Sequence, residues 1–188
     1  MTFRLLFSLL MAWSLAACVT ESSGPAPDPL SQSSAIATST PEFITSPTTT
    51  LRWYSDLVWI DDPEGRYERR ANMLQLALQN EFERKGYTFV GANEQANYDV
   101  LAVAILGELE GQEEVEQVFR MYPSLSSSSQ GYSRGTVLVA LAPAGSKKIV
   151  WRGALEMFTD PGLQQIKVRE QRMSWGAMQV LSSIPNYP

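Results

Sequence analysis

Apolar positions recur along the chain with spacings that predict both strands and helices. The segment from Leu51 to Ile60 is rich in aromatic and β-branched residues, which favour a strand. Residues 98–109 are almost continuously apolar, as expected of a strand that is buried on both faces of a sheet. These segments predict one strand near the start of the folded part and one central strand later in the chain.

The clearest local pattern is a β-hairpin in the second half of the chain. Two apolar runs, 135–141 and 148–158, flank residues 142–146, where Pro and Gly favour a turn. Residues 113–122 are expected to form a further strand with an acidic, solvated start, and residues 124–131 a polar loop.

A helix is expected between these strands, from about Asp61 to Gly86. The run Asp61–Glu64 combines capping carboxylates with a proline suited to the first turn. At the other end, Arg84–Gly86 supplies cations for the last turn and a glycine for the left-handed residue that often follows a helix. Apolar residues recur between these ends at helical spacing, namely Tyr67, Ala71, Leu74, Leu78 and Phe82.

A second helix is expected after Asp160 and Pro161, with apolar residues at Ile166, Met173, Ala177, Val180 and Leu181. The elements together predict an α+β domain with the order β-α-β-β-β-β-α. We expect a mostly antiparallel sheet of about four to five strands with the two helices packed on one face.

The first 17 residues have the features of a secretory signal peptide. A single cation, Arg4, precedes a short apolar run from Leu5 to Ser14, and small residues follow it. The run is shorter than the ~20 residues of a membrane-spanning helix, although a retained anchor is an alternative interpretation.

Leu15-Ala16-Ala17-Cys18 resembles the lipobox of bacterial lipoproteins. In these proteins the chain is cleaved before a cysteine that carries acyl chains such as palmitate, and several chains anchor a protein durably. The resemblance implies cleavage between Ala17 and Cys18 and lipidation of Cys18. By resemblance to Gram-negative lipoproteins, Val19 favours delivery to the outer membrane. An ordinary signal peptide that happens to precede a cysteine is the alternative.

Residues 18–50 are expected to be the lipidated cysteine and a disordered tether. The stretch is dense in Ser, Thr, Pro and Ala and contains no Lys or Arg, so it offers little apolar surface to offset the entropy of ordering. Residues 51–188 are then expected to form a single periplasmic α+β domain.

Composition excludes several kinds of site. The formal net charge is −5, which disfavours sequence-independent binding to nucleic acid. The chain has no histidine, which rules out Ser-His-Asp and Cys-His catalytic systems as well as imidazole metal ligands. Its single cysteine excludes an intrachain disulfide and a thiolate zinc cluster. We expect no metal, no cofactor and no catalytic residue.

The remaining candidates are weak. Glutamates between Glu108 and Glu116 lack the tight turn of a calcium loop and are better explained as a solvated acidic edge. Strand alternation places Ile149, Trp151, Leu155 and Met157 on one face, which favours the core. Arg152 then falls on the other face. Arg152 and Tyr54 are the residues that we expect to be available for contact with a partner.

Four short motifs occur in an order that resembles the domain-of-unknown-function 4136 family of bacterial lipoproteins. They are Arg84-Lys85-Gly86-Tyr87, Asn97-Tyr98-Asp99-Val100-Leu101, Gly135-Thr136-Val137-Leu138-Val139 and Val150-Trp151-Arg152-Gly153, followed by a terminal helix that ends near Ile184-Pro185. The resemblance covers about Leu51 to Pro185 and implies location and fold but no chemistry. One departure is that Ala140 and Ala142 stand where the family often has acidic residues.

These observations predict a lipid-anchored protein of the outer membrane whose domain faces the periplasm and is not an enzyme. Its domain is expected to work by binding, as an accessory or envelope-assembly factor with a protein partner. A carrier of a lipid or other small hydrophobic ligand, with a groove between sheet and helices, is the alternative. An enzyme that uses carboxylates alone is a third possibility.

Overall fold

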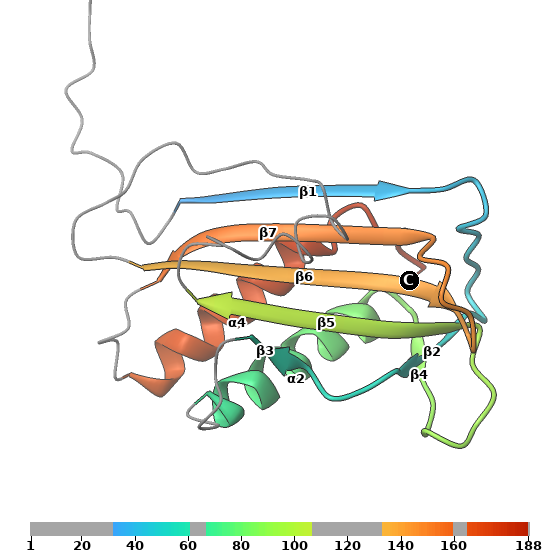
Figure 1. Ribbon diagram of the computed structural model, residues 1–188, viewed down its shortest axis with the longest axis horizontal. Coiled ribbons are helices and arrows are strands. Elements are labelled where there is room, and N and C mark those ends of the chain that lie inside the picture. Colours follow the sequence, from blue (N-terminus) through green and yellow to red (C-terminus); the bar gives the residue numbers. More distant parts are fainter. Residues whose placement is uncertain (1–31, 61–66, 107–132, 160–164, 188) are drawn as a thin grey trace, which may run out of the picture.

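The computed structural model describes residues 32–60, 67–106, 133–159 and 165–187. Their elements form an α+β fold with a seven-stranded mixed sheet and two helices, shown in Figure 1. In chain order they are β1 (Ser33–Ser39), β2 (Thr50–Trp53), β3 (Val58–Trp59), α2 (Glu68–Arg84), β4 (Thr88–Phe89), β5 (Tyr98–Leu106), β6 (Ser133–Pro143), β7 (Trp151–Thr159) and α4 (Ile166–Val180).

The strands are arranged in the order β1-β7-β6-β5-β2-β4, with β3 also paired to β5. The predicted hairpin is confirmed, because β6 and β7 pair antiparallel and Gly145 adopts a φ of 74° in the turn between them. The prediction of four to five mostly antiparallel strands is only partly correct. Pairs β1–β7, β5–β6 and β6–β7 are antiparallel, whereas β2–β4, β2–β5 and β3–β5 are parallel.

The tether predicted over residues 18–50 is wrong for its C-terminal part. Residues 33–39 form β1, which pairs with β7 over its whole length, from Ser33 opposite Met157 to Ser39 opposite Trp151. The physical reason is that a polar Ser/Thr-rich segment can still be ordered when an existing strand offers a row of backbone partners. The sheet, and not the composition of the segment, determines its structure.

The strand predicted over Leu51–Ile60 is interrupted. Trp53 lies opposite Val100 and Val58 lies opposite Val103, so five steps along this segment match three steps along β5. The two extra residues are accommodated by a bend at residues 54–57 that divides the segment into β2 and β3. Tyr54 lies in this bend and is 68% exposed.

Both helices cover the same face of the sheet (Figure 1). The predicted apolar stripe of α2 is confirmed at Ala71, Leu74, Leu78 and Phe82, all buried. The side chains that face them from the sheet include Val100, Ala102, Val137, Val139 and Leu155.

Two predictions of single buried positions are wrong. Ile166 is 44% exposed because it is the first residue of α4, whereas Ala177, Val180 and Leu181 later in the predicted stripe are buried. Ile149 packs against a second cluster on the opposite face of the sheet. The reason is that β7 begins at Trp151, so Ile149 does not follow the alternation of that strand.

The opposite face carries this second, smaller apolar cluster, formed by Ile105, Leu138, Ala140 and Ala154. The central strand β5 is therefore buried on both sides, as its continuous apolar sequence predicted. The caps predicted at Asp61 and Asp160, the strand at 113–122 and the loop at 124–131 lie outside the described residues.

Candidate functional site

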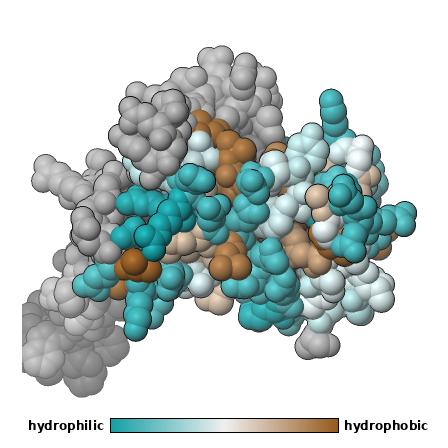
Figure 2. Space-filling view, turned by 90° about the horizontal axis from the view of Figure 1, so that it is seen from below, coloured by the Kyte–Doolittle hydropathy of each residue, from teal (hydrophilic) through white to brown (hydrophobic). Residues whose placement is uncertain are grey.

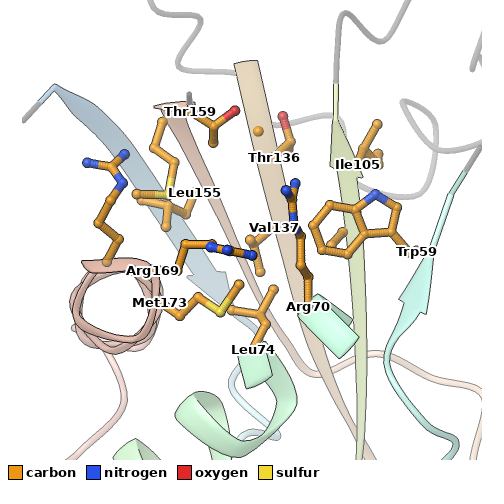
Figure 3. Close-up of a pocket in the computed structure, with 15 residues that line it drawn as sticks. Trp59, Arg70, Leu74, Ile105, Thr136, Val137, Leu155, Thr159, Arg169 and Met173 are labelled. Atoms are coloured by element: carbon orange, nitrogen blue, oxygen red, sulfur yellow. The ribbon is translucent and has the colours of Figure 1, made fainter. Parts of the chain in front are cut away.

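A cavity of about 110 Å³ lies between the helix-covered face of the sheet and the two helices. Its wall combines residues of β3, β5, β6 and β7 with residues of α2 and α4 (Figure 3). The cavity lies toward the N-terminal parts of both helices, where Arg70, Leu74, Arg169 and Met173 contribute to the wall. The groove between sheet and helices that the sequence analysis considered for a ligand carrier is therefore present.

The floor of the cavity is apolar. Side chains of Ala104, Val137, Leu155 and Met157 come from the sheet. Small residues help to keep the space open, since Ala104 is a short side chain in the middle of β5 and Gly176 has none on α4. A β-carbon at Gly176 would lie 3.1 Å from a terminal methyl carbon of Leu155, so even a small side chain there would contact the floor.

Three arginines from the helices contribute to the same wall. Arg70 of α2 and Arg169 of α4 extend toward the middle of the cavity in Figure 3. Arg172, one turn further along α4, donates to the main-chain carbonyl of Phe158. The guanidinium carbon of Arg70 lies 5.2 Å from the centre of the Tyr67 ring, which orients this side chain by a cation–π contact.

The sheet also contributes polar residues to the wall. Thr136 and Thr159 contribute to the wall, and the indole of Trp59 forms one side of it (Figure 3). The Nε1 atom of Trp59 is buried and has no hydrogen-bond acceptor among the described residues. Its ring stacks on Tyr67 with centroids 5.0 Å apart. All charged side chains of the described wall are positive.

The two residues predicted for partner contact lie elsewhere and apart from each other. Tyr54 contributes to a surface hollow of about 220 Å³ beside Leu101, Ala142 and Lys147. Arg152 is half-buried and contributes to a different hollow beside β1, also of about 220 Å³. It lies on the face opposite Trp151, as predicted, and Trp151 is buried in the core with Leu155 and Met157. The structure does not bring Arg152 and Tyr54 into one site.

The motif Asn97-Tyr98-Asp99 joins separate parts of the backbone. The side-chain oxygen of Asn97 accepts from the main-chain nitrogen of Thr50 at 2.8 Å, and the hydroxyl of Tyr98 donates to the carbonyl of Ile44 at 2.7 Å. The buried carboxylate of Asp99 accepts from Arg52 at 2.7–2.9 Å and from the main-chain nitrogen of Gly145 at 2.8 Å. These residues hold β2, the segment before it and the hairpin turn against β5.

The motif Arg84-Lys85-Gly86-Tyr87 holds the C-terminal segment against the end of α2. The buried Nζ atom of Lys85 donates to the carbonyl of Ile184 at 3.1 Å, and the carbonyl of Lys85 accepts from the main-chain nitrogen of Tyr187 at 2.7 Å. Burial lowers the pKa of Lys85 from its ordinary value. These motifs therefore stabilise the fold and do not line the cavity.

Position 153 of the fourth motif also has a structural role. A β-carbon at Gly153 would lie 2.7 Å from the indole of Trp151 and 2.9 Å from the carbonyl oxygen of Val180, so only glycine fits beside α4. The Nε1 atom of Trp151 donates to the hydroxyl of Ser183 at 3.2 Å. Ala140 and Ala142 are the two positions that differ from the family pattern. Ala140 is buried in the second cluster, and Ala142 is half-buried.

Ala17 and Cys18, the predicted cleavage and lipidation residues, lie outside the described residues, as do the glutamates from Glu108 to Glu116. The described residues contain no group of three acidic or cysteine side chains placed to hold a metal ion. No helix in the described part of the chain is long and apolar enough to cross a membrane.

The sequence pattern missed the residues of the cavity as a group. Arg70 lies about a hundred positions before Arg169 and Arg172 in the sequence, and each is an ordinary helix residue in its own segment. One available signal was the placement of cations near the N-terminal ends of both helices, where acidic residues are the more stabilising choice. An unfavourable local choice that recurs on two helices indicates a role in tertiary structure or binding.

No protein-family model matches the sequence, and no curated protein matches it either. Several solved structures are similar to this chain. The PelC dodecamer from Paraburkholderia phytofirmans is 10% identical, covers 84% of this chain and 100% of its own, and superposes with a TM-score of 0.52. At this identity the likeness is one of fold.

Two further structures are similar with lower TM-scores. A domain-of-unknown-function 4136 family protein from Bacteroides thetaiotaomicron is 15% identical, covers 78% of this chain and 95% of its own, and has a TM-score of 0.46. A domain-of-unknown-function 330 protein from Xanthomonas campestris is 10% identical, covers 78% of this chain and 86% of its own, and has a TM-score of 0.43. The solved structures similar to this chain therefore include a member of the 4136 family, the family that its sequence motifs resemble.

Proposed function

We propose that this chain is a lipid-anchored protein of the cell envelope whose folded domain binds a small apolar molecule between its sheet and its helices. The observation that carries the proposal is the cavity with an apolar floor at this position. Ligand sites are concave and mostly apolar, with a small number of polar groups that fix orientation. The cavity has this composition, with its polar groups on the helices and at Trp59.

The size of the cavity suits a small ligand. An apolar cavity of about 150 Å³ in another protein binds benzene, which has six carbon atoms. A space of about 110 Å³ is therefore suited to a chain of roughly six carbons, or to the end of a longer chain. The two larger hollows are surface depressions with fewer lining residues, and they support a ligand site less well.

The cavity favours a ligand carrier over a factor that binds only protein partners. The face in Figure 2 carries small apolar areas separated by hydrophilic residues, whereas protein interfaces often appear as one large exposed apolar patch. The exposed apolar side chains are likewise spread over several elements, among them Ile36 of β1, Leu76 of α2 and Met178 of α4.

Binding without catalysis is part of the proposal. The chain has no histidine, and the described residues of the cavity wall include no carboxylate that could serve as a general base. Attachment through Cys18, with Val19 directing the protein to the outer membrane, follows from the lipobox resemblance and is likewise proposed.

The test is to fill the cavity and to look for a ligand that purifies with the protein. Ala104→Leu adds three carbon atoms to a floor residue that is 2% exposed. The matched control is Ala142→Leu, the same substitution in the surface hollow of Tyr54. Each full-length protein is purified without added lipid, and small molecules released by denaturation are identified by mass spectrometry.

We expect an apolar molecule to be released in stoichiometric amount by the wild type and by Ala142→Leu, and to be lost from Ala104→Leu. Circular dichroism and thermal unfolding show whether Ala104→Leu keeps the fold. A folded Ala104→Leu protein that releases the same molecule as the wild type would exclude the cavity as the binding site.

A further inference from the structure

We propose that two copies of this chain associate through the outer edge of β1, which pairs antiparallel with β1 of the second copy and joins the two sheets into one. β1 is the outermost strand of the sheet in Figure 1, and its strand partner among the described residues is β7 alone. An edge strand has a row of main-chain N–H and C=O groups on its outer side with which another strand can pair. The inference concerns this edge and is independent of the cavity.

The two edges of the sheet differ in how well they are protected from such pairing. Proteins protect an edge with a very short strand, charged side chains, a proline or a bulge. The edge strand β4 has two residues, whereas β1 has seven. The sequence of β1, Ser-Ser-Ala-Ile-Ala-Thr-Ser, contains no charge and no proline, and each of its residues lies opposite one residue of β7 without a bulge. β1 is therefore a long edge strand without these protections.

The direction of the main-chain groups of β1 follows from one hydrogen bond at its end. The main-chain nitrogen of Thr40, the residue after β1, donates to the carbonyl of Val150, on the side of β7. Successive residues of a strand direct their N–H and C=O groups to alternate sides. The even-numbered residues of β1 therefore face β7, and the outward groups belong to the odd-numbered residues, which are Ser33, Ala35, Ala37 and Ser39.

One register pairs all of these outward groups. A two-fold axis through Ile36 places Ser33 opposite Ser39 of the second copy and Ala35 opposite Ala37. An axis through Ala35 or Ala37 would leave one of the outward residues of each β1 without an opposite residue in the strand. The axis through Ile36 is therefore the register that the backbone favours.

The side chain at the axis supports the same register. Ile36 is 40% exposed, and it lies opposite Ala154, on the face of the sheet that carries the second apolar cluster. At the axis, Ile36 faces Ile36 of the second copy in a pair without main-chain hydrogen bonds, the kind in which opposite side chains come closest. The association covers an exposed apolar side chain and extends the second cluster. It brings no like charges of β1 together.

The first experiment is sedimentation equilibrium of the full-length protein over a range of concentrations. One strand pair is a small interface, so we expect a weak dimer that dissociates on dilution. Ile36→Lys places two cations at the axis and is expected to raise the dissociation constant at least about tenfold. The matched control is Ile44→Lys, the same substitution at an isoleucine that is 75% exposed and lies outside β1, which should leave the dissociation constant unchanged.

Ala35→Pro tests the main-chain pairing. Proline removes an N–H group that faces outward, so the hydrogen bonds between β1 and β7 are kept, and proline is tolerated at such positions of edge strands. We expect this variant also to raise the dissociation constant at least about tenfold. Circular dichroism and thermal unfolding of the monomer show that each variant is folded.

The second experiment tests the register by disulfide formation. Cysteines are introduced into the full-length Cys18→Ala protein, which otherwise has none. Ile36→Cys is expected to cross-link with itself, because the two Cα atoms at the axis lie within the range of a disulfide. Ser34→Cys and Thr38→Cys are expected to cross-link only when the two proteins are mixed. Two copies of either residue lie about 13 Å apart in this register, beyond the reach of a disulfide.

A wild type that stays monomeric at millimolar concentration would overturn the proposal. So would a dimer or larger assembly whose dissociation constant Ile36→Lys and Ala35→Pro leave at the value found for Ile44→Lys, since another surface would then hold the copies together. Self-cross-linking of Ser34→Cys or Thr38→Cys as fast as that of Ile36→Cys would contradict the axis through Ile36.

Discussion

Gly86 shows how a single residue can fix the end of an element and the course of the chain after it. It follows α2 with a φ of 92°, in the left-handed region that favours glycine. A β-carbon at this position would overlap the carbonyl oxygen of Tyr187 in the C-terminal segment. Position 86 therefore needs glycine for two independent reasons, conformation and space.

Gly86→Ala is expected to lower the free energy of unfolding by roughly 3–4 kcal/mol, which combines left-handed strain with displacement of the C-terminal segment. The matched control is Gly145→Ala. Gly145 also has a positive φ, of 74°, but a β-carbon there would meet no atom within 4 Å, so strain alone should cost about 1–2 kcal/mol. Urea unfolding measures both values, and equal losses would contradict the role assigned to Tyr187.

For single residues, the sequence predicted the glycine that ends α2 but did not predict the residues that line the cavity. The cation-cation-glycine pattern predicted the end of α2 correctly, because helix termination is a local property. Tyr54 and Arg152 were selected for exposure along single strands, and they lie in separate hollows. Arg70 and Arg169 were not selected, because the packing of two helices on one sheet brings them to the same cavity wall and their local sequence does not show it.

Among the elements, β1 and β7 differ most from the expectation. The hairpin was predicted from local alternation, but β7 is buried along almost its whole length, as expected of an interior strand with a neighbour on each side. The signal for β1 in the sequence was the presence of apolar residues at both odd and even positions of β7. Parallel pairing of β2 with β5 was also missed, since it depends on how α2 returns the chain to the sheet and not on either strand alone.

The segment after β1 is held to the hairpin by an ion pair. The Nζ atom of Lys148 lies 2.8 Å from a carboxylate oxygen of Glu42. The hydrogen bond from Lys148 lowers the pKa of Glu42 from 4.5 to about 2, with a smaller contribution from Thr40. Because the folded pKa is lower than the unfolded one, the ion pair stabilises the fold above pH 4.5, and this contribution is lost as the pH falls toward about 2.

Lys148→Ala is expected to raise the pKa of Glu42 toward its ordinary value of 4.5. Lys147→Ala, at the neighbouring exposed lysine, is the control and should leave the pKa of Glu42 unchanged. The measurement is an NMR titration of the Glu42 side-chain carboxyl in the three proteins. A pKa near 4.5 already in the wild type would show that the segment after β1 is not held to the hairpin in this way.

For the whole molecule, the ordered β1 shortens the proposed link between membrane and domain. With the domain starting at Ser33, the spacer that follows Cys18 is residues 19–32, instead of the stretch to residue 50 that composition predicted. Fourteen residues span at most about 50 Å when fully extended. The proposed anchor would therefore keep the cavity near the membrane surface.

The anchor itself is tested by the intact mass of the protein extracted from membranes. We expect the wild type to be cleaved before Cys18 and to carry acyl chains, and the Cys18→Ala variant to lack both changes and to leave the membrane fraction or remain unprocessed. Recovery of an unlipidated wild type in the soluble fraction would contradict membrane attachment but would leave the cavity proposal intact.

The most direct test of ligand binding in the cavity is an NMR titration of the methionine methyl groups with hexanol, an apolar probe of six carbons. Met157 and Met173 line the cavity, whereas Met178 lies on the same helix as Met173, is 43% exposed and lies outside the wall. We predict saturable shifts of the Met157 and Met173 methyl signals while that of Met178 stays in place. Equal shifts at all three, or none at Met157 and Met173, would contradict a ligand between the sheet and the helices.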